Sequence, residues 1–500
     1  MSLTKKLVVI VLIACLGIGI LRVGRNTNMQ EEENKKMSFY QTETLYLWYT
    51  DDIYTDYFTS ASVEFHEINP DIRVIPMLVS DSEYLERINE ASLSNEDFPD
   101  IFMLTNDSLE KAYLAGLASK VKDVGDVLNE DHFSQGALHA VSYRDSYVAY
   151  PVSFEGTVLV YNKTYLNDWV ENVNAGLVSS FEDGAFMDDE GNIVSDDVDE
   201  EEKEMVSLED YIPRSFDDIR SFADRYEAPD GVEKILEWDV SDVIFNYLFV
   251  GRYMNFGGDA GDDINNISIL NDNTLVSTKV FQGLHDAFSI DAATSDYNKV
   301  VEDFLDGKTV YALASTDIIK TIEDRIEKAD EQARLEAEAD LLDQPEETEE
   351  GEEEETVEAP SILDENKIKV YDYGYALIPD VTLDLASRSL SVTNALVING
   401  YSEKKEAANK FGAFLSTEYA PQLYPKTGRL SASLDADYTD PGMVIFQEEY
   451  AGSIPLPKMV EVSNLWVQLE IALNDIWAGQ DAATRLQNLE DQIKSQVVAE

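Results

Sequence analysis

Cysteine is almost absent from this 500-residue chain, in which Cys15 is the single example. A chain with one cysteine cannot form an internal disulfide, and it cannot build a zinc site from cysteine thiolates. The four histidines show no metal-ligand spacing, and the sequence has no glycine-rich phosphate loop and no nucleophile elbow. We therefore expect no catalytic residues, no cofactor and no metal site.

Basic residues are also scarce, with 37 Lys and Arg against 99 Asp and Glu and a net charge of -62. Such a charge repels phosphate backbones, so we expect no nucleic-acid partner. Much of the imbalance lies in residues 179–212 and 323–366, which we interpret as acidic surface insertions, the second partly disordered. Loose calcium binding is the alternative for these oxygen-rich segments, although the EF-hand spacing is absent.

The chain has one long apolar run, residues 7–21, which follows Lys5 and Lys6. This order is typical of an export signal, and the run is short for a full membrane span. Residues 12–15 (LIAC) resemble the bacterial lipobox, which implies lipidation of Cys15. An uncleaved signal anchor is the alternative. In either case we expect residues 1–25 to act as signal peptide or anchor and 26–42 as a flexible tether on the outer face of the cytoplasmic membrane.

The remaining chain has strand and helix patterns in alternation. Its hydrophobic content of 44% is enough for two compact lobes. The predicted elements are strand 43–49, helix 54–69, strand 71–76, helix 82–93, strand 100–104, helix 109–115 and, much later, a charged helix 322–342. Strands alternating with helices predict a parallel sheet covered on both faces. Ligands bind beyond the carboxyl ends of such strands, so the loops after Trp48 and Leu104 become candidate site walls.

Several local stretches, in order along residues 44–493, carry a family resemblance. The main ones are 98–102 (FPDIF), 150–163 (YPVSFEGTVLVYNK), 304–312 (FLDGKTVYA), 373–379 (YGYALIP) and 407–415 (AANKFGAFL). Together they resemble the extracellular solute-binding proteins of ABC importers, of the maltodextrin-binding type. The resemblance implies an α/β, two-lobed type II periplasmic-binding-protein fold. It also implies a monomeric receptor that closes on a mono- or oligosaccharide and delivers it to ABC permease subunits.

The same resemblance implies the domain organisation. The N-terminal lobe comprises 43–153 plus 386–430, and the C-terminal lobe comprises 154–385 plus 431–500. The chain then crosses between the lobes near 153–157, 379–387 and 429–436.

A sugar site needs flat apolar surfaces for the rings and polar groups for the hydroxyls. By resemblance, Trp466 and Tyr247 are stacking aromatics, although Tyr247 could equally be a buried core residue. Trp477 lies on nearly the same helical face as Trp466, so one of this pair could belong to the core.

Polar candidates for ligand binding come from the same resemblance and from strand ends. They are Asp51, Asp52, Asp107, Glu155, Asp317 and Arg429. Asp107 could instead cap the helix that begins at Ser108. Arg429 could bind ligand or brace the hinge.

The substrate class stays open at this stage. Maltodextrin binders have a cleft tryptophan and an arginine at positions where this chain has Leu104 and Ser108. A further tryptophan of those binders corresponds to a position near Asp317 in this chain. The candidate carboxylates would also suit a cationic solute such as a polyamine. A surface interaction protein that has lost transport is a further alternative. A glycoside hydrolase is the last alternative, because no carboxylate pair stands out.

Overall fold

The structure, a computed structural model, describes residues 42–80, 82–94, 98–175, 186–187, 193–194, 205–342, 372–460 and 464–498. The predicted anchor with Cys15, and much of both predicted insertions, lie outside these residues. The unit Glu43–Glu500 contains all of the described residues except Thr42.

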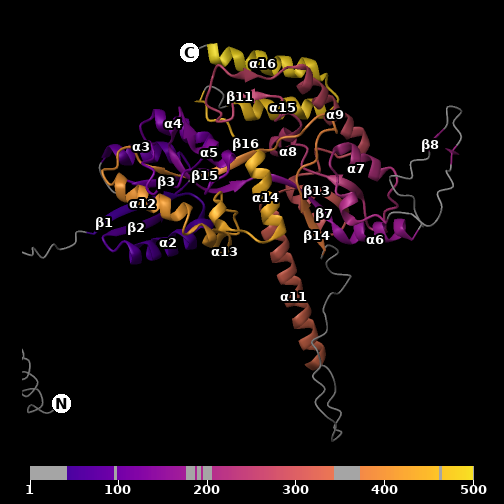
Figure 1. Ribbon diagram of the computed structural model, residues 1–500, viewed down its shortest axis with the longest axis horizontal. Coiled ribbons are helices and arrows are strands. Elements are labelled where there is room, and N and C mark those ends of the chain that lie inside the picture. Colours follow the sequence, from indigo (N-terminus) through magenta and orange to yellow (C-terminus); the bar gives the residue numbers. More distant parts are fainter. Residues whose placement is uncertain are drawn as a thin grey trace, which may run out of the picture. The chain divides into compact units, whose positions relative to one another are not determined.

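Two sheets organise this unit (Figure 1). The first has the order β16-β15-β3-β1-β2, with β6 also paired to β15. Its strands are β1 (Glu43–Tyr49), β2 (Ile72–Leu78), β3 (Ile101–Thr105), β6 (Ala149–Glu155), β15 (Leu390–Ile398) and β16 (Ile454–Pro455). β1 runs parallel to β2 and β3, as predicted. β15, however, runs antiparallel to both β3 and β6, so the expectation of a purely parallel sheet is wrong. After β6 the chain passes into the second sheet, and it returns to the first sheet only with β15. Because β15 enters the first sheet from the side of the second sheet, it runs opposite to β6.

The second sheet has the order β10-β13-β7-β14. Its strands are β7 (Thr157–Asn162), β10 (Lys234–Glu237), β13 (Thr309–Ser315) and β14 (Tyr373–Ala376). β10 is parallel to β13, whereas β7 is antiparallel to β13 and pairs Thr157 with Ser315. The ends of β10 and β13 and the start of β7 therefore lie at one edge of this sheet. Only Gly156 separates β6 in the first sheet from β7 in the second.

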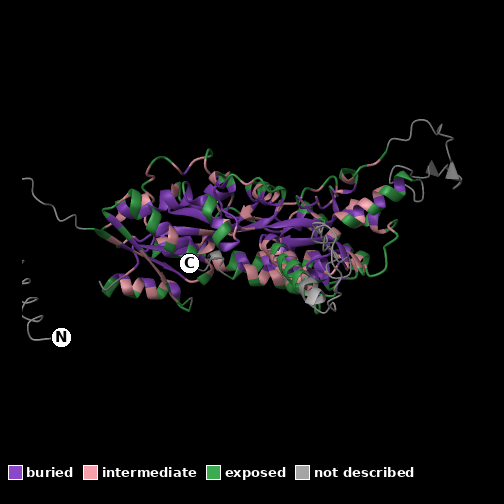
Figure 2. Ribbon diagram, turned by 90° about the horizontal axis from the view of Figure 1, so that it is seen from below, coloured by how far each residue is buried: buried purple, intermediate pink, exposed green. Residues whose placement is uncertain are grey.

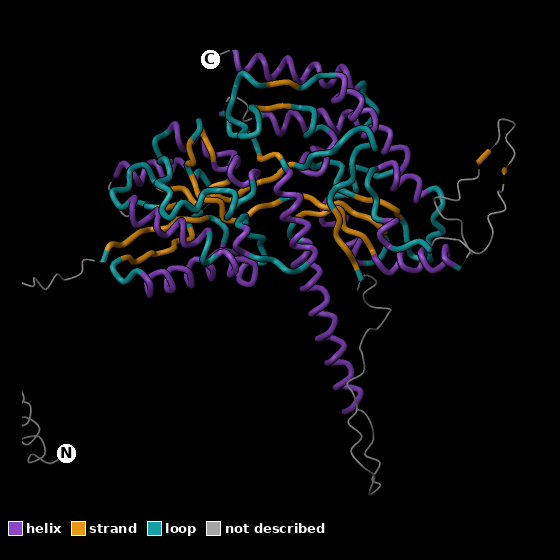
Figure 3. Tube along the Cα trace, viewed as in Figure 1, coloured by secondary structure: helices purple, strands orange, loops and turns teal. Residues whose placement is uncertain are grey.

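Helices pack around these sheets (Figure 3). They are α2 (Thr55–Ile68), α3 (Tyr84–Ser94), α4 (Leu109–Leu114), α5 (Gln135–Val141), α6 (Lys163–Asn174), α7 (Phe216–Ala223), α8 (Val243–Asn246), α9 (Asp272–Phe288), α10 (Tyr297–Leu305), α11 (Ile318–Leu342), α12 (Lys405–Ser416), α13 (Leu423–Thr427), α14 (Pro441–Gly452), α15 (Leu465–Trp477) and α16 (Ala482–Val498).

Short elements complete the fold. The 3-10 turns are η1 (Asp52–Tyr54), η2 (Asn106–Ser108), η3 (Leu208–Tyr211), η4 (Tyr247–Phe249), η5 (Ala420–Gln422) and η6 (Leu434–Ala436). Two-residue strands form the antiparallel pairs β4 (Ser142–Tyr143) with β5 (Ser146–Tyr147), β8 (Phe186–Met187) with β9 (Ile193–Val194), and β11 (Asn255–Phe256) with β12 (Ile267–Ser268).

The central strands of both sheets are buried on both faces (Figure 2). Successive residues of a strand point to opposite faces, so Ile101 and Met103 of β3 join one core cluster and Phe102 and Leu104 join another. In β7, Val158 and Val160 likewise belong to the cluster that contains Ile101, whereas Leu159 lies in a third cluster. One core cluster therefore continues from the first sheet into the second. This two-sided burial explains why the central strands read as nearly unbroken apolar runs.

The predicted early elements are confirmed, with ends that differ by up to two residues. The predicted helix 322–342 exists as α11 but begins four residues earlier, at Ile318. Its first turns are anchored by buried Ile318, Ile319 and Ile322, and from Glu327 onward the described side chains are largely exposed. Figure 3 shows this helix extending away from the two sheets.

Candidate functional site

A pocket of about 370 Å³ lies at the carboxyl ends of β1, β3 and β6. The loop after β1 contributes Thr50 and Asp51, and the end of β6 contributes Glu155. Further polar lining residues are Glu83, Glu86, Thr105, Ser108, Lys111 and Asn394. Apolar wall comes from Met103 and Leu104. The position beyond the strand ends is the one that the order of strands and helices predicts.

Asp51 and Asp52 occupy the turn that follows β1. Asp51 accepts a hydrogen bond from the backbone N–H of Ile53 at 3.1 Å and so caps the turn η1. Both carboxylates are exposed. The cap fixes the course of the loop, and Asp51 retains acceptor capacity for a ligand.

Glu155 and Arg429 form an ion pair of 3.2 Å that joins the end of β6 to a segment 274 residues later. Both side chains are partly exposed, so solvent weakens the pair. Beside it, the hydroxyls of Tyr54 and Ser153 lie 2.7 Å apart. Burial raises the pKa of Tyr54 to about 12, so its hydroxyl stays protonated. Arg429 thus braces the chain beside the pocket through Glu155.

Asp317 lies at the edge of the second sheet, just after β13. Its carboxylate accepts a hydrogen bond from the Tyr297 hydroxyl at 2.7 Å, and the backbone N–H of Ser315 donates to the same hydroxyl at 3.0 Å. Burial, followed by the charge of Asp317, raises the pKa of Tyr297, and the charge of Glu155 acts in the same direction. Asp317 is therefore held by Tyr297, and the charge of Glu155 at the end of β6 reaches the same hydroxyl.

Asp107 lies in the turn after β3, between the pocket residues Thr105 and Ser108. Its carboxylate accepts a hydrogen bond from the Thr105 hydroxyl at 2.5 Å. Helix α4 is capped by Ser108 without a side-chain hydrogen bond. Asp107 is thus placed beside the pocket and does not act as the side-chain cap of α4.

Trp466 and Tyr247 contact each other edge to face, with ring centroids 5.9 Å apart. Trp466 is half-buried near the start of α15, whereas Tyr247 is 1% exposed within the core. Tyr247 therefore packs against the Trp466 ring from the core and offers no open face in this structure. Trp477 is the core member of the tryptophan pair, since it is 3% exposed and donates its indole N–H to the carbonyl of Ile290 at 3.3 Å.

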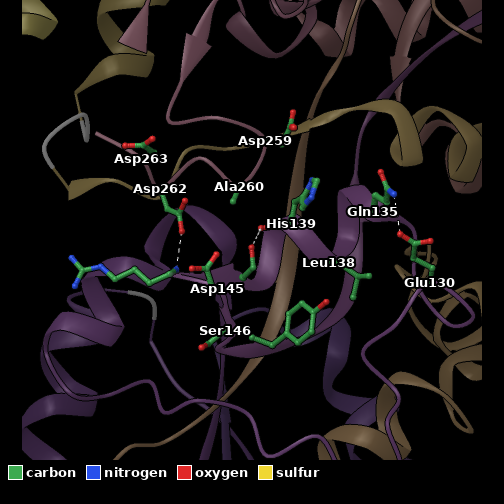
Figure 4. A pocket seen from close by; sticks show the side chains of 13 residues that line it. Glu130, Gln135, Leu138, His139, Asp145, Ser146, Asp259, Ala260, Asp262 and Asp263 are labelled. Atoms are coloured by element: carbon green, nitrogen blue, oxygen red, sulfur yellow. Dashed lines mark hydrogen bonds between the residues drawn. The ribbon is translucent and has the colours of Figure 1, made fainter. Parts of the chain in front are cut away.

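A second pocket of about 810 Å³ lies between α5, the hairpin β4–β5 and the loop after β11 (Figure 4). The backbone N–H of Arg144 donates to the Asp262 carboxylate at 2.9 Å across this pocket. Nearby, buried Lys458 donates to the carbonyls of His139, at 2.8 Å, and Ala260. None of the site residues predicted from the sequence lines this second pocket.

The sequence did not single out Glu83, Lys111, Asn394, Tyr54 or Tyr297. Glu83 has a positive φ of 54°, which a sequence pattern does not reveal. The others belong to elements whose proximity depends on the tertiary fold. A clue was available for Asn394 alone, because a polar residue interrupts the apolar run of β15.

Comparisons with known proteins identify the family and the fold of this chain. The family model described as bacterial extracellular solute-binding protein matches residues 49–420. This chain belongs to that family. The match covers most of the described lobes and confirms the resemblance seen in the sequence motifs. The comparison with curated proteins found no matching sequence.

Solved structures with the same fold come from several bacteria. An extracellular solute-binding protein from Staphylococcus aureus in complex with maltose has a TM-score of 0.66 at 16% identity, covering 91% of this chain and 98% of that one. The maltose-binding periplasmic protein MalE from Listeria monocytogenes, in complex with maltose, has a TM-score of 0.62 at 17% identity, covering 92% of this chain and 99% of that one. MalX from Streptococcus pneumoniae, in complex with maltopentaose, has a TM-score of 0.57 at 17% identity, covering 90% of this chain and 99% of that one. These likenesses confirm the predicted two-lobed α/β fold of this family member.

Two kinds of feature are absent from the described residues. In that part of the chain no helix combines the length and apolar character needed to cross a membrane. The same part contains no group of three or more His, Cys, Asp or Glu side chains arranged to hold a metal ion.

Proposed function

We propose that this chain is the extracytoplasmic receptor of an ABC importer and that it binds a carbohydrate between its two lobes. The observation that carries the proposal is the pocket at the carboxyl ends of β1, β3 and β6, in a chain that belongs to a solute-binding family. Similar folds with maltose and maltopentaose in their complexes support the choice of solute class. The half-buried ring of Trp466 supplies a flat apolar surface for a sugar ring.

The proposed mechanism is closure of two lobes, 43–153 plus 386–430 and 154–385 plus 431–500. A solute that contacts Asp51, Asp52 or Asp107 on one side and Asp317 or Trp466 on the other binds more tightly when the lobes are closed. Closure then presents the loaded receptor to the permease. Glu155 and Arg429, at two chain crossings, hold the hinge segments together while the lobes move.

The test is calorimetric titration with maltose, maltotriose, maltotetraose, a glucosamine oligosaccharide and spermidine, with chromatography of the sugars afterwards. We expect at least one sugar to bind and to be recovered intact. Binding of spermidine alone contradicts the carbohydrate assignment, and release of shorter sugars supports the hydrolase alternative. The absence of binding to every sugar overturns the proposal.

We also propose that Cys15 carries the lipid that tethers the receptor to the outer face of the cytoplasmic membrane. The sequence motif at 12–15 supports this assignment. In a bacterial host fed labelled palmitate, the wild type should become labelled and Cys15→Ser should not. A Cys15→Ser protein that stays membrane-bound, with no label on the wild type, indicates the signal anchor instead.

We also propose that the receptor is a monomer. Light scattering of residues 43–500, which lack the anchor and need no detergent, measures the molar mass that tests this.

A further inference from the structure

Strand β15 has three polar side chains among its apolar ones, and two of them are paired inside the protein. Ser391 donates to the carbonyl of Ile454 at 3.3 Å, and the hydroxyls of Thr393 and Tyr450 lie 2.8 Å apart. Asn394 is the third, and its half-buried side-chain amide forms no hydrogen bond within the part of the chain that the structure describes. Because polar groups inside a fold are nearly always paired, this amide is the exception in the strand.

Asn394 lines the pocket at the carboxyl ends of β1, β3 and β6. Its register partners are Thr105 in β3, on one side, and Ser153 in β6, on the other. Both neighbours are already engaged, since Thr105 donates to the Asp107 carboxylate at 2.5 Å and the Ser153 hydroxyl lies 2.7 Å from that of Tyr54. The unpaired amide therefore lies in the middle of a polar row whose other two members have partners.

Strand β6 is irregular at the same point. Asn394 is opposite Ser153 and Ala395 is opposite Pro151, so Val152 is an extra residue in β6. Such a bulge leaves one residue out of the ladder, and bulges are common beside binding sites, where they redirect a side chain. The irregularity of the sheet thus coincides with the strand position whose amide is unpaired and lines the pocket.

The chemistry of a carboxamide suits a hydroxyl group. The side-chain carbonyl of Asn394 accepts hydrogen bonds and its NH2 group donates them, and a hydroxyl can do both in return. An ammonium group only donates, so it leaves the NH2 group without an acceptor. The carboxylates of the pocket, Asp51, Glu83 and Glu155, can accept from either kind of solute. The amide is therefore the group in this pocket that distinguishes the two.

We propose that Asn394 is a specificity-determining residue, which binds a hydroxyl group of the solute and so selects a sugar over a polyamine. This inference rests on the proposed function, because it names what that same pocket recognises. When the lobes close, water leaves the amide, and a solute without a hydroxyl leaves it unpaired. A site built to pair with a hydroxyl rejects an analogue that lacks one strongly, because its own polar group then has no partner.

The test replaces the amide by leucine, a side chain of similar size without a hydrogen-bonding group. The full chain, purified in detergent, and its Asn394→Leu variant are titrated with maltose, maltotriose, maltotetraose, the glucosamine oligosaccharide and spermidine. We expect every sugar that binds the wild type to lose about tenfold or more in affinity for the variant. Any affinity for spermidine should stay the same.

A second measurement distinguishes recognition from a structural role. The amide has no partner in the fold to lose, and its strand is otherwise largely apolar, so leucine should keep or raise the melting temperature of the free receptor. Asn394→Ala removes the same groups without adding bulk and should show the same loss of sugar affinity. The control is Asn273→Leu, at an exposed position of α9 that lines neither described pocket, and it should leave all affinities unchanged.

The outcomes separate the inference from the proposed function. If a sugar binds the wild type and a folded Asn394 variant equally well, the inference is overturned and the proposed function stands. The same holds if sugars and spermidine lose affinity alike, or if both variants lose melting temperature together with affinity, because the amide then serves the fold. If no sugar binds the wild type, both fail.

Discussion

Trp466 and Trp477 stand at the two ends of α15 and have different surroundings. Trp477 is enclosed by Trp238, Phe281 and His285, with ring centroids 5.0 to 5.3 Å away. Trp466 contacts Tyr247 on one edge and is otherwise half-open. The exposed ring is the one available to a solute, and the enclosed ring serves the core.

We predict opposite effects for substitutions at these two positions. Trp466→Ala should weaken sugar binding by at least tenfold, since aromatic anchors commonly contribute about 2 kcal/mol or more at binding sites. Trp477→Phe should lower the free energy of unfolding while leaving affinity nearly unchanged. Calorimetric titration and urea denaturation of both variants measure the two quantities. Equal affinity of Trp466→Ala and wild type would show that the sugar does not use this ring.

Lys458 is buried with its ammonium between two backbone carbonyls. Burial lowers its pKa from the ordinary lysine value of 10.5 to about 7, against the smaller opposing influence of Asp262 and Glu110. Between pH 7 and 10.5 the unfolded chain therefore holds a proton on this residue that the folded chain has lost. The contribution of Lys458 to the free energy of unfolding therefore rises with pH across this window, because the unfolded state binds more protons at this residue.

We predict that the free energy of unfolding rises more steeply with pH in the wild type than in Lys458→Met. The lysine should contribute about 1.4 kcal/mol per pH unit to the rise in unfolding free energy between pH 7.5 and 9.5, and the variant should lack that contribution. Urea denaturation at several pH values measures both slopes. Lys410→Met, at a half-exposed position on α12, serves as control and should keep the wild-type slope. Parallel curves for wild type and Lys458→Met would mean that Lys458 stays protonated in the fold.

At the scale of elements, α12 packs on β6 through a glycine. A Cβ atom at Gly412 would lie 2.6 Å from Cδ2 of Tyr150, whose side chain is fully buried. The absence of a side chain at this position lets the helix approach the strand. Gly283 in α9 is the opposite case, because a Cβ there would meet no atom within 4 Å.

Substituting alanine for these two helical glycines should therefore change the free energy of unfolding in opposite directions. Gly412→Ala should destabilise the protein by about 1 to 3 kcal/mol through overpacking against Tyr150. Gly283→Ala should stabilise it by up to about 1 kcal/mol, because alanine is the better helix former. Thermal and urea unfolding of the two variants provide the comparison. A stabilised Gly412→Ala protein would show that the strand can move away without cost.

Helix α11 is anchored at its start and exposed beyond. Arg325 pairs with Asp306 at 3.0 Å, so the contacts with α10 and its following turn extend to this point. Replacing residues 343–371 by a glycine-serine segment of equal length removes acidic residues of the second insertion without touching that anchor. We expect the melting temperature and the sugar affinity to stay close to wild type. Loss of cell-surface function with intact sugar binding would instead favour the alternative of a surface interaction protein.

At the scale of the whole molecule, the two sheets share one continuous core cluster, yet their strand ends supply different candidate groups. A solute held between the lobes should protect backbone amides on both sides. Hydrogen exchange with and without saturating sugar should show slower exchange in 101–108 and also in 309–317, because the ligand stabilises the closed state that contacts both. Protection confined to one of these segments would place the solute on a single lobe.

The sequence by itself determined the local elements, because side-chain periodicity follows backbone geometry. The patterns in 43–49 and 71–76 predicted strands that the structure contains, and the ordered motifs predicted the family. It also indicated Asp51 as a residue at a strand end and, through the family resemblance, Glu155, and both line the pocket.

Only the tertiary structure decided which side chains lie together. Tyr247 and Trp466 look alike as candidates in the sequence, but their exposure depends on what packs against them. Glu155 and Arg429 are 274 residues apart and meet through chain crossings that local patterns do not encode. The antiparallel direction of β15 was likewise invisible, because a strand buried on both faces has the same apolar pattern in either direction.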